Sequence, residues 1–500
     1  MKENITTKEQ LRKLYDDICA GRELRPSLIE LKMQLKAEDT RRQFGAVCGG
    51  NYDPVMKCLA DEDPKVRKNA AAVLGLLKLQ ESVDVLMDAY LAEDQLFVRP
   101  EYVKAMAGMD CGEYLDDFRE RLEELSACEA PENEKKHIRA EMHELQELLL
   151  AKGGWKKHAF TGFECVNEVI LTTPAVFRDL LAGEISSKKI LLKSGIRTVT
   201  AHMEELLGSR LWREMLFVIH GPQNAPETAE ELGAWLTGSD LMEILAKNHS
   251  GEAPWYFRIS AGERRTEAMG GDFIKAAAQA VEEASGRRLV NSPSHYELEI
   301  RLAEKKDGGF LPLLKLYTLP DHRFAYRRYA VAAGMKPSLA AGLLALAKPY
   351  LKEYAQVLDP FCGAGTLLIE RRFLTPVRNL YGIDVFGEAV AKARANTKAV
   401  GFQANYINRD YFDFTHAYLF DEIITDMPAG NGKAETDLLY RRFFEKSAEL
   451  LAEHGRIVMY SGEMGLVKKY LRLQNRFRLL QEFCIQEKRG MYLFILEKKD

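Results

Sequence analysis

Four aspartates in the last third of the chain could together bind one ligand. Asp359, Asp384, Asp410 and Asp426 each stand at or just after the carboxyl end of a run that is expected to form a strand. In open sheets of parallel strands, ligands bind along the rim formed by these ends. Because carboxylates accept hydrogen bonds, the series predicts a ligand rich in donors, such as an ammonium group, ribose hydroxyls or an adenine amino group.

A glycine turn lies beside the first of these aspartates. Residues 357–366, VLDPFCGAGT, predict a short buried strand, a turn and the start of a helix. Gly363 and Gly365 let the backbone pass close under a ligand, and the following helix directs its free N–H groups toward the same place. Turns between strands and helices also use glycine for steric reasons alone, so this stretch by itself leaves both interpretations open.

These residues need a sheet to bring them together. From Gln356 onward strand-like and helix-like runs alternate, and seven runs are candidates for strands: 357–358, 380–383, 406–407, 422–425, 456–460, 478–485 and 492–496. The first five are separated by helices or crossovers, which predicts a parallel doubly wound sheet. Only Gln486 to Gly490 separates the last two, which is too short for a crossover helix, so we expect an antiparallel pair at one edge.

Two other nucleotide-binding loops fit the sequence poorly. A nicotinamide enzyme would also place an acidic residue near Asp384, which follows Gly365 by 19 residues. Its third glycine or alanine is replaced here by Leu368. A phosphate-binding P-loop needs Gly-Lys-Ser/Thr, which this loop lacks.

The loop resembles a known family of enzymes. Residues 359–370, DPFCGAGTLLIE, are similar to the cofactor loop of THUMP-domain-containing RNA (guanine-N2)-methyltransferases, and Gly382-Ile383-Asp384 is similar to the second motif of that family. The resemblance implies a Rossmann-like class I methyltransferase domain that uses S-adenosylmethionine. It also implies that Asp384 contacts the ribose, that Asp410 lies at the adenine, and that the methionine end of the cofactor lies at the loop. The cofactor-binding residues expected on this basis are Asp359, Phe361, Gly363, Gly365, Thr366, Asp384 and Asp410.

A fourth motif should decide the chemistry. Residues 425–430 read TDMPAG, where relatives have Asp/Asn-x-Pro-aromatic-Gly. Methylation of an exocyclic amine needs acceptors for its N–H groups, and the Asp426 carboxylate and the Pro428 carbonyl could supply them by positioning and electrostatics. Ala429 replaces the aromatic residue on which a flipped base would stack. Another ring could substitute, and the candidates are Tyr411, Phe412 and Tyr440.

Composition limits the remaining possibilities. With 46% hydrophobic and 29% charged residues, 500 residues predict a globular protein of several domains. The start of the chain is polar, and no run of 18 or more apolar residues occurs, so we expect a cytoplasmic protein. Eight scattered cysteines indicate neither a zinc site nor a disulfide framework. Residues 1–150 carry 22 Lys and Arg against 31 Asp and Glu, whereas the rest carries 48 against 43, so the acidic end is not expected to contact nucleic acid.

The acidic end shows an internal repeat. The pairs Val66-Arg67 and Val98-Arg99 lie 32 residues apart, and Gly75 and Gly108 lie 33 apart. A period of this length in helical sequence is typical of solenoids, where each unit buries its apolar face on its neighbours. Residues 1–152 therefore resemble HEAT repeats, with an irregular helical bundle as the alternative, and docking of a protein partner or a substrate is the expected function.

The middle of the chain, residues 158–325, predicts a small α/β module. Strand-like runs occur at 165–173, 255–260 and 296–302, a helix at 272–284, and a hairpin leads into 311–319. The order resembles the THUMP domain and its ferredoxin-like half, which implies RNA binding. The cations that we would test are Arg258, Arg264, Arg265, Arg287 and Arg288.

The sequence therefore predicts a multidomain protein with a helical repeat domain, a THUMP-type module and, at 326–500, a methyltransferase domain. Its expected activity is methylation of the guanine N2 amine in RNA, tRNA in preference to rRNA, after base flipping. The alternative is a catalytically impaired pseudo-methyltransferase that acts as an RNA-binding scaffold.

Overall fold

The computed structural model describes residues 7–499, except 128–130, 153–157, 223–225, 262, 305–308 and 333, and only the backbone at 127, 132, 263–271 and 304. The chain divides into two compact units. One consists of Met1–Lys157 and Ser292–Tyr296, and the other of His158–Asn291 and Glu297–Asp500. Across the described ranges, every helix is too short or too polar to cross a membrane.

The first unit is built from helices. They are α1 (Thr7–Cys19), α2 (Leu24–Gln34), α3 (Glu38–Cys48), α4 (Asp53–Lys57), α5 (Pro64–Leu77), α6 (Val83–Ala92), α7 (Arg99–Met106), α8 (Leu115–Ala127) and α9 (Glu132–Ala151). The apolar residues Ile138, Met142, Leu145 and Leu149 are three or four positions apart, which predicts an amphipathic helix at 132–150, and this helix is observed as α9. Gly153 and Gly154, where the sequence predicts its end, lie outside the described residues.

Helix α5 packs closely against α7 at Gly75, the first glycine of the repeat. A Cβ at Gly75 would lie 2.7 Å from the Ala105 Cα, so the two helices approach too closely for any side chain there. Arg67 on α5 donates two hydrogen bonds, of 2.8 and 2.6 Å, to the Glu93 carboxylate just after α6. Because the Glu93 side chain is only 1% exposed, this ion pair is largely shielded from water. It joins α5 to the end of α6.

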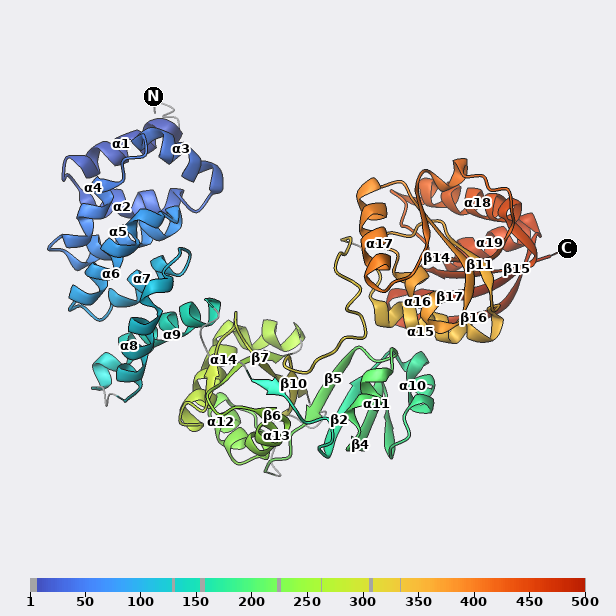
Figure 1. Ribbon diagram of the computed structural model, residues 1–500, viewed down its shortest axis with the longest axis horizontal. Coiled ribbons are helices and arrows are strands. Elements are labelled where there is room, and N and C mark those ends of the chain that lie inside the picture. Colours follow the sequence, from blue (N-terminus) through green and yellow to red (C-terminus); the bar gives the residue numbers. More distant parts are fainter. Residues whose placement is uncertain are drawn as a thin grey trace. The chain divides into compact units, whose positions relative to one another are not determined.

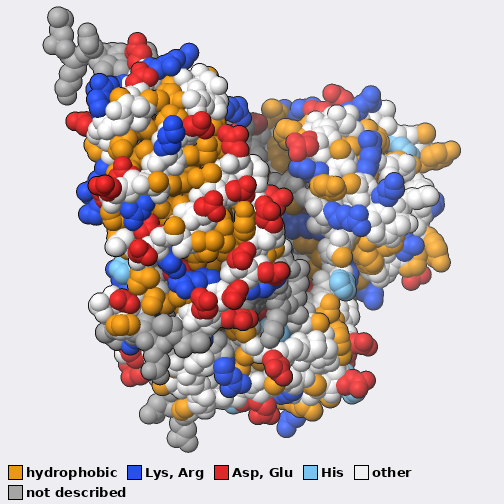
Figure 2. Space-filling view, turned by 60° about the vertical axis from the view of Figure 1, so that its left-hand side comes forward, with side chains coloured by type: hydrophobic (Ala, Val, Ile, Leu, Met, Phe, Trp, Pro, Cys, Tyr) orange, Lys and Arg blue, Asp and Glu red, His pale blue; other side chains and the backbone are white. Residues whose placement is uncertain are grey.

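The surface of the repeat domain mixes apolar and charged side chains. In Figure 2, hydrophobic and acidic side chains lie next to one another over the face of this domain that comes forward. The exposed apolar residues include Met33, Val85 and Leu91, with exposed fractions of 58%, 40% and 63%.

The first half of the second unit contains an eight-stranded sheet with the strand order β3-β4-β2-β5-β10-β9-β7-β8, within the described residues. Its strands are β2 (Asn167–Thr172), β3 (Lys189–Leu192), β4 (Gly195–Thr200), β5 (Glu214–Val218), β7 (Trp255–Ala261), β8 (Leu289–Asn291), β9 (Leu298–Glu304) and β10 (Phe310–Leu316). Two short strands, β1 (Ala159–Phe160) and β6 (His249–Ser250), pair separately. The accompanying helices are α10 (Arg178–Glu184), α11 (Met203–Gly208), α12 (Ala229–Thr237), α13 (Leu241–Asn248) and α14 (Glu263–Ala284).

The predicted strands of this module are present with shifted ends. β9 and β10 pair as an antiparallel hairpin, as expected. However, β9 begins at Leu298 rather than at Tyr296, because Ser292–Tyr296 pack with the first unit, where the Ser292 hydroxyl donates a hydrogen bond to Glu147. The second strand of the hairpin ends at Leu316 rather than at Leu319.

The second half of this unit is a doubly wound sheet of seven strands, in the order β13-β12-β11-β14-β15-β17-β16, within the described residues. The strands are β11 (Ala355–Asp359), β12 (Val377–Asp384), β13 (Asn405–Asn408), β14 (Phe420–Asp426), β15 (Leu451–Ser461), β16 (Phe477–Gln486) and β17 (Met491–Lys498). β11 to β15 run parallel, and β16 and β17 form an antiparallel pair at one edge, as the short link between them predicts.

Helices cover both faces of this sheet (Figure 1). Apolar residues of α15 (Pro337–Ala347), α16 (Thr366–Leu374) and α17 (Gly387–Ala399) share one core cluster, which includes Val357 and Ile424. Those of α18 (Lys433–Leu450) and α19 (Met464–Gln474) share the other, which includes Leu358 and Ile423. Successive residues of a buried strand thus face opposite layers, which is why these strands are apolar throughout.

An ion pair joins the two halves of the second unit. Arg210, which follows α11, donates two hydrogen bonds of 2.8 Å to Glu370 on α16. The Tyr326 hydroxyl donates a third, of 2.6 Å, to the same carboxylate. Glu370 and Tyr326 are only 2% and 3% exposed, whereas Arg210 is half-buried, so the carboxylate of this contact is shielded from water.

Candidate active site

A cavity of about 580 Å³ lies at the carboxyl ends of β11, β12 and β14. This is the rim where the sequence places the aspartates. Of the cofactor-binding and catalytic residues expected from the sequence, all except Gly365 line it: Asp359, Phe361, Gly363, Thr366, Asp384, Asp410, Asp426 and Pro428.

The loop after β11 is fixed by hydrogen bonds to its neighbours. The Cys362 N–H donates to the Ile383 carbonyl of β12 at 2.9 Å, and the Gly365 N–H donates to the Cys362 carbonyl at 2.8 Å. The Asn396 side chain, on α17, donates to the Ala364 carbonyl at 3.1 Å and to the Tyr329 carbonyl at 2.9 Å. The loop is therefore preorganised by β12, by α17 and by the segment that precedes α15.

The two glycines of the loop differ in what they do. Both have positive φ, +52° at Gly363 and +81° at Gly365. A Cβ at Gly363 would meet only the Val331 Cγ2, at 3.6 Å, and Val331 lines the cavity, so the missing side chain leaves room there. A Cβ at Gly365 would lie 2.5 Å from the Tyr406 hydroxyl, so Gly365 is required by packing beneath the loop.

The carboxylates at the rim have different surroundings. Asp359 is 1% exposed and accepts a hydrogen bond of 3.2 Å from the Phe361 N–H, and burial raises its pKa well above the usual range. Asp384 accepts from the N–H groups of Gly363 and Phe386, both at 2.9 Å. Asp410 accepts from the Phe412 N–H, also at 2.9 Å.

Asp426 is the acceptor that the protein leaves unused. Desolvation by burial raises its pKa to about 6. Among the described residues none donates a hydrogen bond to its carboxylate, although it is half-buried and lines the cavity. The Met427 N–H donates to the Tyr460 carbonyl at 3.0 Å and fixes the end of β14, beyond which Pro428 and Ala429 are exposed. The Asp426 carboxylate is thus positioned to receive a donor from a ligand.

Only one of the three rings that could replace the missing aromatic residue is available. Tyr411 and Tyr440 are both 1% exposed, and their hydroxyls contact Ser447 and Ser461. Tyr440, moreover, does not line the cavity. Phe412 lines it and is half-buried, and the Arg442 guanidinium lies 4.0 Å from the centre of its ring.

The segment before α15 contributes residues that the sequence does not single out. Val331, Gly334 and Met335 line the cavity opposite the glycine loop. None carries a group that takes part in chemistry, so no residue type signals their position. Asn396 makes this contact, because its side chain donates to the carbonyls of both Tyr329 and Ala364 and so joins the segment to the loop.

The arginines proposed for RNA binding differ in their contacts and in their exposure to solvent. Arg258 donates to Glu299, at 3.0 and 2.5 Å, and to the Tyr317 hydroxyl. Arg287 forms an ion pair of 2.7 Å with Glu282, whereas Arg288 is exposed. Arg264 and Arg265 belong to α14, but their side chains lie outside the described residues.

Comparisons with known proteins bear on this cavity and on the repeats. Residues 325–489 match the family model of the RMKL-like methyltransferase domain. That range contains every residue that lines the cavity. S-adenosylmethionine, expected from the sequence, is confirmed by this match as the cofactor. Residues 52–128 match a model of HEAT repeats, which confirms the helical repeats of the first unit.

Individual relatives cover a smaller share of the chain. A tRNA (guanine(10)-N2)-dimethyltransferase from Methanothermobacter thermautotrophicus is 33% identical over 138 residues, which are 27% of this chain and 40% of that protein. The U6 snRNA (guanine-N(2))-methyltransferase THUMPD2 from Bos taurus is 29% identical over 148 residues, 28% of each chain. This chain thus spans less than half the length of either. The crystal structure of TrmN from Thermus thermophilus is 23% identical, with a TM-score of 0.48 over 66% of this chain and 99% of that one.

The residues around the cavity fit the cofactor. The space at Gly363 admits a ligand against the backbone, and the carboxylates of Asp384 and Asp410 each retain lone pairs after accepting from the backbone. Val385 and Phe386, which are 57% and 71% exposed and line the cavity, offer apolar surface to a planar base.

Proposed function

We propose that the chain is an S-adenosylmethionine-dependent RNA methyltransferase that methylates the N2 amine of a guanine, in tRNA in preference to rRNA. The observation that carries the proposal is the Asp426 carboxylate, which lines the cavity and accepts from no described residue. Two curated relatives are named as guanine-N2 methyltransferases, one of tRNA and one of U6 snRNA, and this supports RNA as the substrate.

In this proposal the loop and the rim hold the cofactor. Asp384 takes the ribose hydroxyls, Asp410 lies at the adenine, and Asp359 with Gly363 surrounds the methionine end. The bound cofactor supplies an electrophilic methyl group. Gly365 acts indirectly, because it lets the loop sit on Tyr406.

The fourth motif then orients the amine. The Asp426 carboxylate and the Pro428 carbonyl accept its N–H groups, which turns the nitrogen lone pair toward the methyl carbon by positioning and electrostatics. As the amine nitrogen bonds to the methyl carbon and the bond from that carbon to the cofactor sulfur breaks, the amine gives up one proton, and the Asp426 carboxylate accepts it. With a pKa of about 6, Asp426 is ionised at neutral pH yet basic enough for this step.

Base flipping brings the guanine to this position, and Phe412 supplies the stacking surface that Ala429 lacks. One face of the Phe412 ring is covered by the Arg442 guanidinium at 4.0 Å, which stiffens it. Stacking of a base on an aromatic ring is worth about 1–3 kcal/mol.

The other parts of the chain bind the rest of the RNA and other proteins. Residues 158–325 act as a THUMP-type RNA-binding module, for which Arg258, Arg264, Arg265, Arg287 and Arg288 are candidates. The HEAT-like repeats offer exposed apolar side chains, including Met33 and Leu91, to a protein partner. The protein works in the cytoplasm.

Nucleoside analysis tests this function in cells. RNA from cells that lack the protein should contain less N2-methylguanosine, as seen by mass spectrometry of the modified nucleosides. Wild-type protein should restore the modification, and Asp426→Ala should not. Full restoration by Asp426→Ala would refute the assignment of the acceptor, and an unchanged nucleoside profile would refute the activity.

A further inference from the structure

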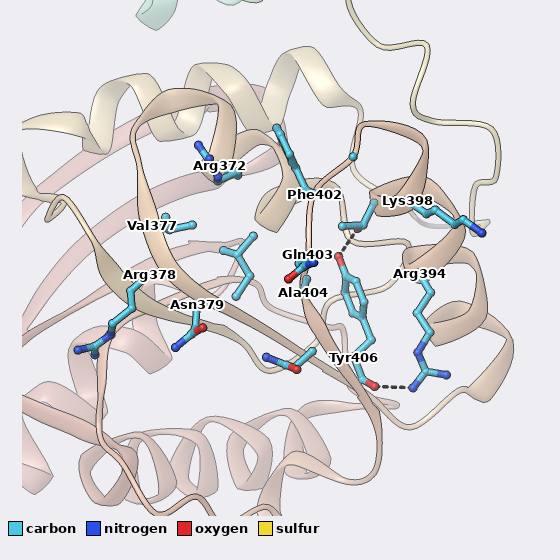
Figure 3. A pocket seen from close by; sticks show the side chains of 14 residues that line it. Arg372, Val377, Arg378, Asn379, Arg394, Lys398, Phe402, Gln403, Ala404 and Tyr406 are labelled. Carbon is cyan, nitrogen blue, oxygen red and sulfur yellow. Dashed lines mark hydrogen bonds between the residues drawn. The ribbon is translucent and has the colours of Figure 1, made fainter.

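A second cavity, of about 900 Å³, lies on the methyltransferase domain beside the edge strand β13 (Figure 3). It is lined by residues from the end of α16, the start of β12, the second half of α17 and the loop that leads into β13. We call it the basic cleft, because four of its lining residues are cations: Arg372, Arg378, Arg394 and Lys398.

The positive charge of the cleft is poorly neutralised. None of the described residues that line it carries a carboxylate. Arg378 has Asp421 at 3.4 Å, whereas no described carboxylate lies within ion-pair distance of Arg372, Arg394 or Lys398. Arg378, Arg394 and Lys398 are exposed. Exposed cations without carboxylate partners attract polyanions, because binding releases the counterions of the phosphates.

The cations stand apart from one another. In Figure 3, Arg378 lies at one end of the cleft, and Arg394 and Lys398 lie at the other. Arg394 is fixed by a hydrogen bond of 2.6 Å to the Tyr406 carbonyl on the edge strand, and the Arg372 guanidinium lies 5.2 Å from the centre of the Phe402 ring. A single phosphate could not contact all four side chains. The spacing suits a chain of successive phosphates.

The cleft is separate from the active site. It includes Val377, the first residue of β12, whereas Asp384, the last residue of that strand, lines the active-site cavity. Seven steps along a strand at about 3.3 Å per residue put these two residues roughly 23 Å apart, whereas Tyr406, at the other side of the cleft, pairs with Gly382 only two residues before Asp384. A ligand that reaches from Arg378 to Asp384 must therefore be elongated.

We propose that the basic cleft binds the sugar-phosphate backbone of the RNA substrate, at nucleotides other than the one that is methylated. The inference rests on the proposed function, since it takes RNA as the substrate. Phosphate contacts of this kind position a nucleic acid without reading its sequence. The cleft therefore sets affinity and register, and the active-site cavity selects the base.

Charge reversal in the full-length protein tests the cleft. We expect Lys398→Glu to weaken binding of fluorescently labelled tRNA by about tenfold at low salt, and to lower the slope of log affinity against log salt by about one. Arg394→Glu should act in the same way. Lys392→Glu is the matched control, because Lys392 lies on the same helix, pairs with Glu388 and does not line the cleft. Lys392→Glu has the same net charge as Lys398→Glu and should change tRNA affinity less than twofold.

Three further measurements separate the outcomes. The dissociation constant for S-adenosylmethionine should be equal in all variants, which shows that the fold is intact. In methyl transfer, Lys398→Glu should raise the KM for tRNA and leave kcat unchanged.

If Lys398→Glu binds tRNA as tightly as Lys392→Glu does, the proposal is wrong. It is also wrong if inorganic pyrophosphate binds the wild type but not Lys398→Glu, while tRNA binds both equally, since the cleft would then be a site for a small anion. Because binding of tRNA is measured without turnover, a protein that binds tRNA through the cleft but transfers no methyl group would refute the catalytic assignment alone.

Discussion

The backbone N–H of Gly363 donates a hydrogen bond of 2.9 Å to the carboxylate of Asp384. This bond joins the glycine loop after β11 to the end of β12. The second oxygen of Asp384 accepts from the Phe386 N–H at 2.9 Å, so the same carboxylate also fixes the start of the next connection. Asp384 therefore shapes the cavity as well as offering acceptors to the cofactor.

Replacement of Asp384 by Ala should remove both the hydrogen bonds that shape the cavity and the acceptors for the cofactor. We expect the affinity for S-adenosylmethionine, measured by calorimetry, to fall at least about tenfold, because a charge-assisted hydrogen bond contributes roughly 1.5–3 kcal/mol. Glu388→Gln is a suitable control, since Glu388 lies on the adjoining helix, pairs only with Lys392 among the described residues and does not line the cavity. An unchanged affinity in Asp384→Ala would place the cofactor elsewhere.

The two glycines of the loop should respond differently to Ala. Gly363→Ala introduces a methyl group with room around it, so it should cost about 1 kcal/mol of stability through its positive φ and mainly weaken cofactor binding. Gly365→Ala should lower the free energy of unfolding by about 2–4 kcal/mol, because its Cβ would overlap the Tyr406 hydroxyl.

The Tyr406→Phe variant, which lacks the Tyr406 hydroxyl, tests whether this contact is what requires glycine at position 365. Urea unfolding of Gly365→Ala, Tyr406→Phe and the double variant should give a double variant more stable than the sum of the single effects predicts. Strictly additive effects would mean that the contact with Tyr406 does not set the requirement for glycine.

The raised pKa of Asp426 predicts a pH dependence of catalysis. If the ionised carboxylate accepts the amine, kcat/KM should rise about tenfold per pH unit below pH 6 and level off above it, since the free-enzyme pKa is about 6. Methyl transfer to tRNA measured between pH 5 and 8 tests this. A rate that increases toward low pH would exclude the carboxylate as acceptor.

Ionisation of Asp426 should lower the stability of the folded protein as pH rises, although it raises catalytic activity. Its pKa is about 6 when folded and about 3.9 when unfolded, so the folded protein binds more protons between these values and loses stability as pH rises through them. Asp426→Asn should therefore be more stable than the wild type at pH 8, by roughly 1–3 kcal/mol. The difference should vanish below about pH 4. A less stable Asp426→Asn at pH 8 would mean that the carboxylate is stabilised by partners in the folded state.

Phe412→Leu distinguishes a base-stacking ring from a cofactor contact. The variant keeps an apolar side chain but loses stacking, so we expect the KM for tRNA to rise between about fivefold and a hundredfold. The dissociation constant for S-adenosylmethionine should stay within twofold. The reverse pattern, with weaker cofactor binding and unchanged KM, would assign the ring to the cofactor.

The sequence predicts the seven-stranded sheet closely. Each of the seven strand candidates lies within an observed strand, from β11 to β17. The parallel strands are recognisable because they are short apolar runs between turns and helices, and the last two because only a short link separates them. The aspartates mark where those strands end, so the rim of the sheet and most of the cavity follow from the same pattern.

Contacts between distant parts of the sequence could not be predicted in this way. Arg210 and Glu370 pair across 160 residues, and nothing in either neighbourhood indicates the other. The position of Gly365 in the sequence assigns it to the ligand loop, but the requirement for glycine comes from Tyr406, 41 residues later. Val331 and Met335 carry no reactive group, so only the folded chain shows that they close the cavity.

The central claim is tested most directly by methyl transfer with the purified full-length protein. Labelled S-adenosylmethionine and bulk tRNA are the substrates, cofactor binding is measured in parallel, and the labelled nucleoside is identified by mass spectrometry. We expect the wild type to produce N2-methylguanosine, and Asp426→Ala to bind the cofactor but transfer no methyl group. A wild-type protein that binds S-adenosylmethionine yet labels no RNA would refute the proposed activity and identify the domain as a binding scaffold.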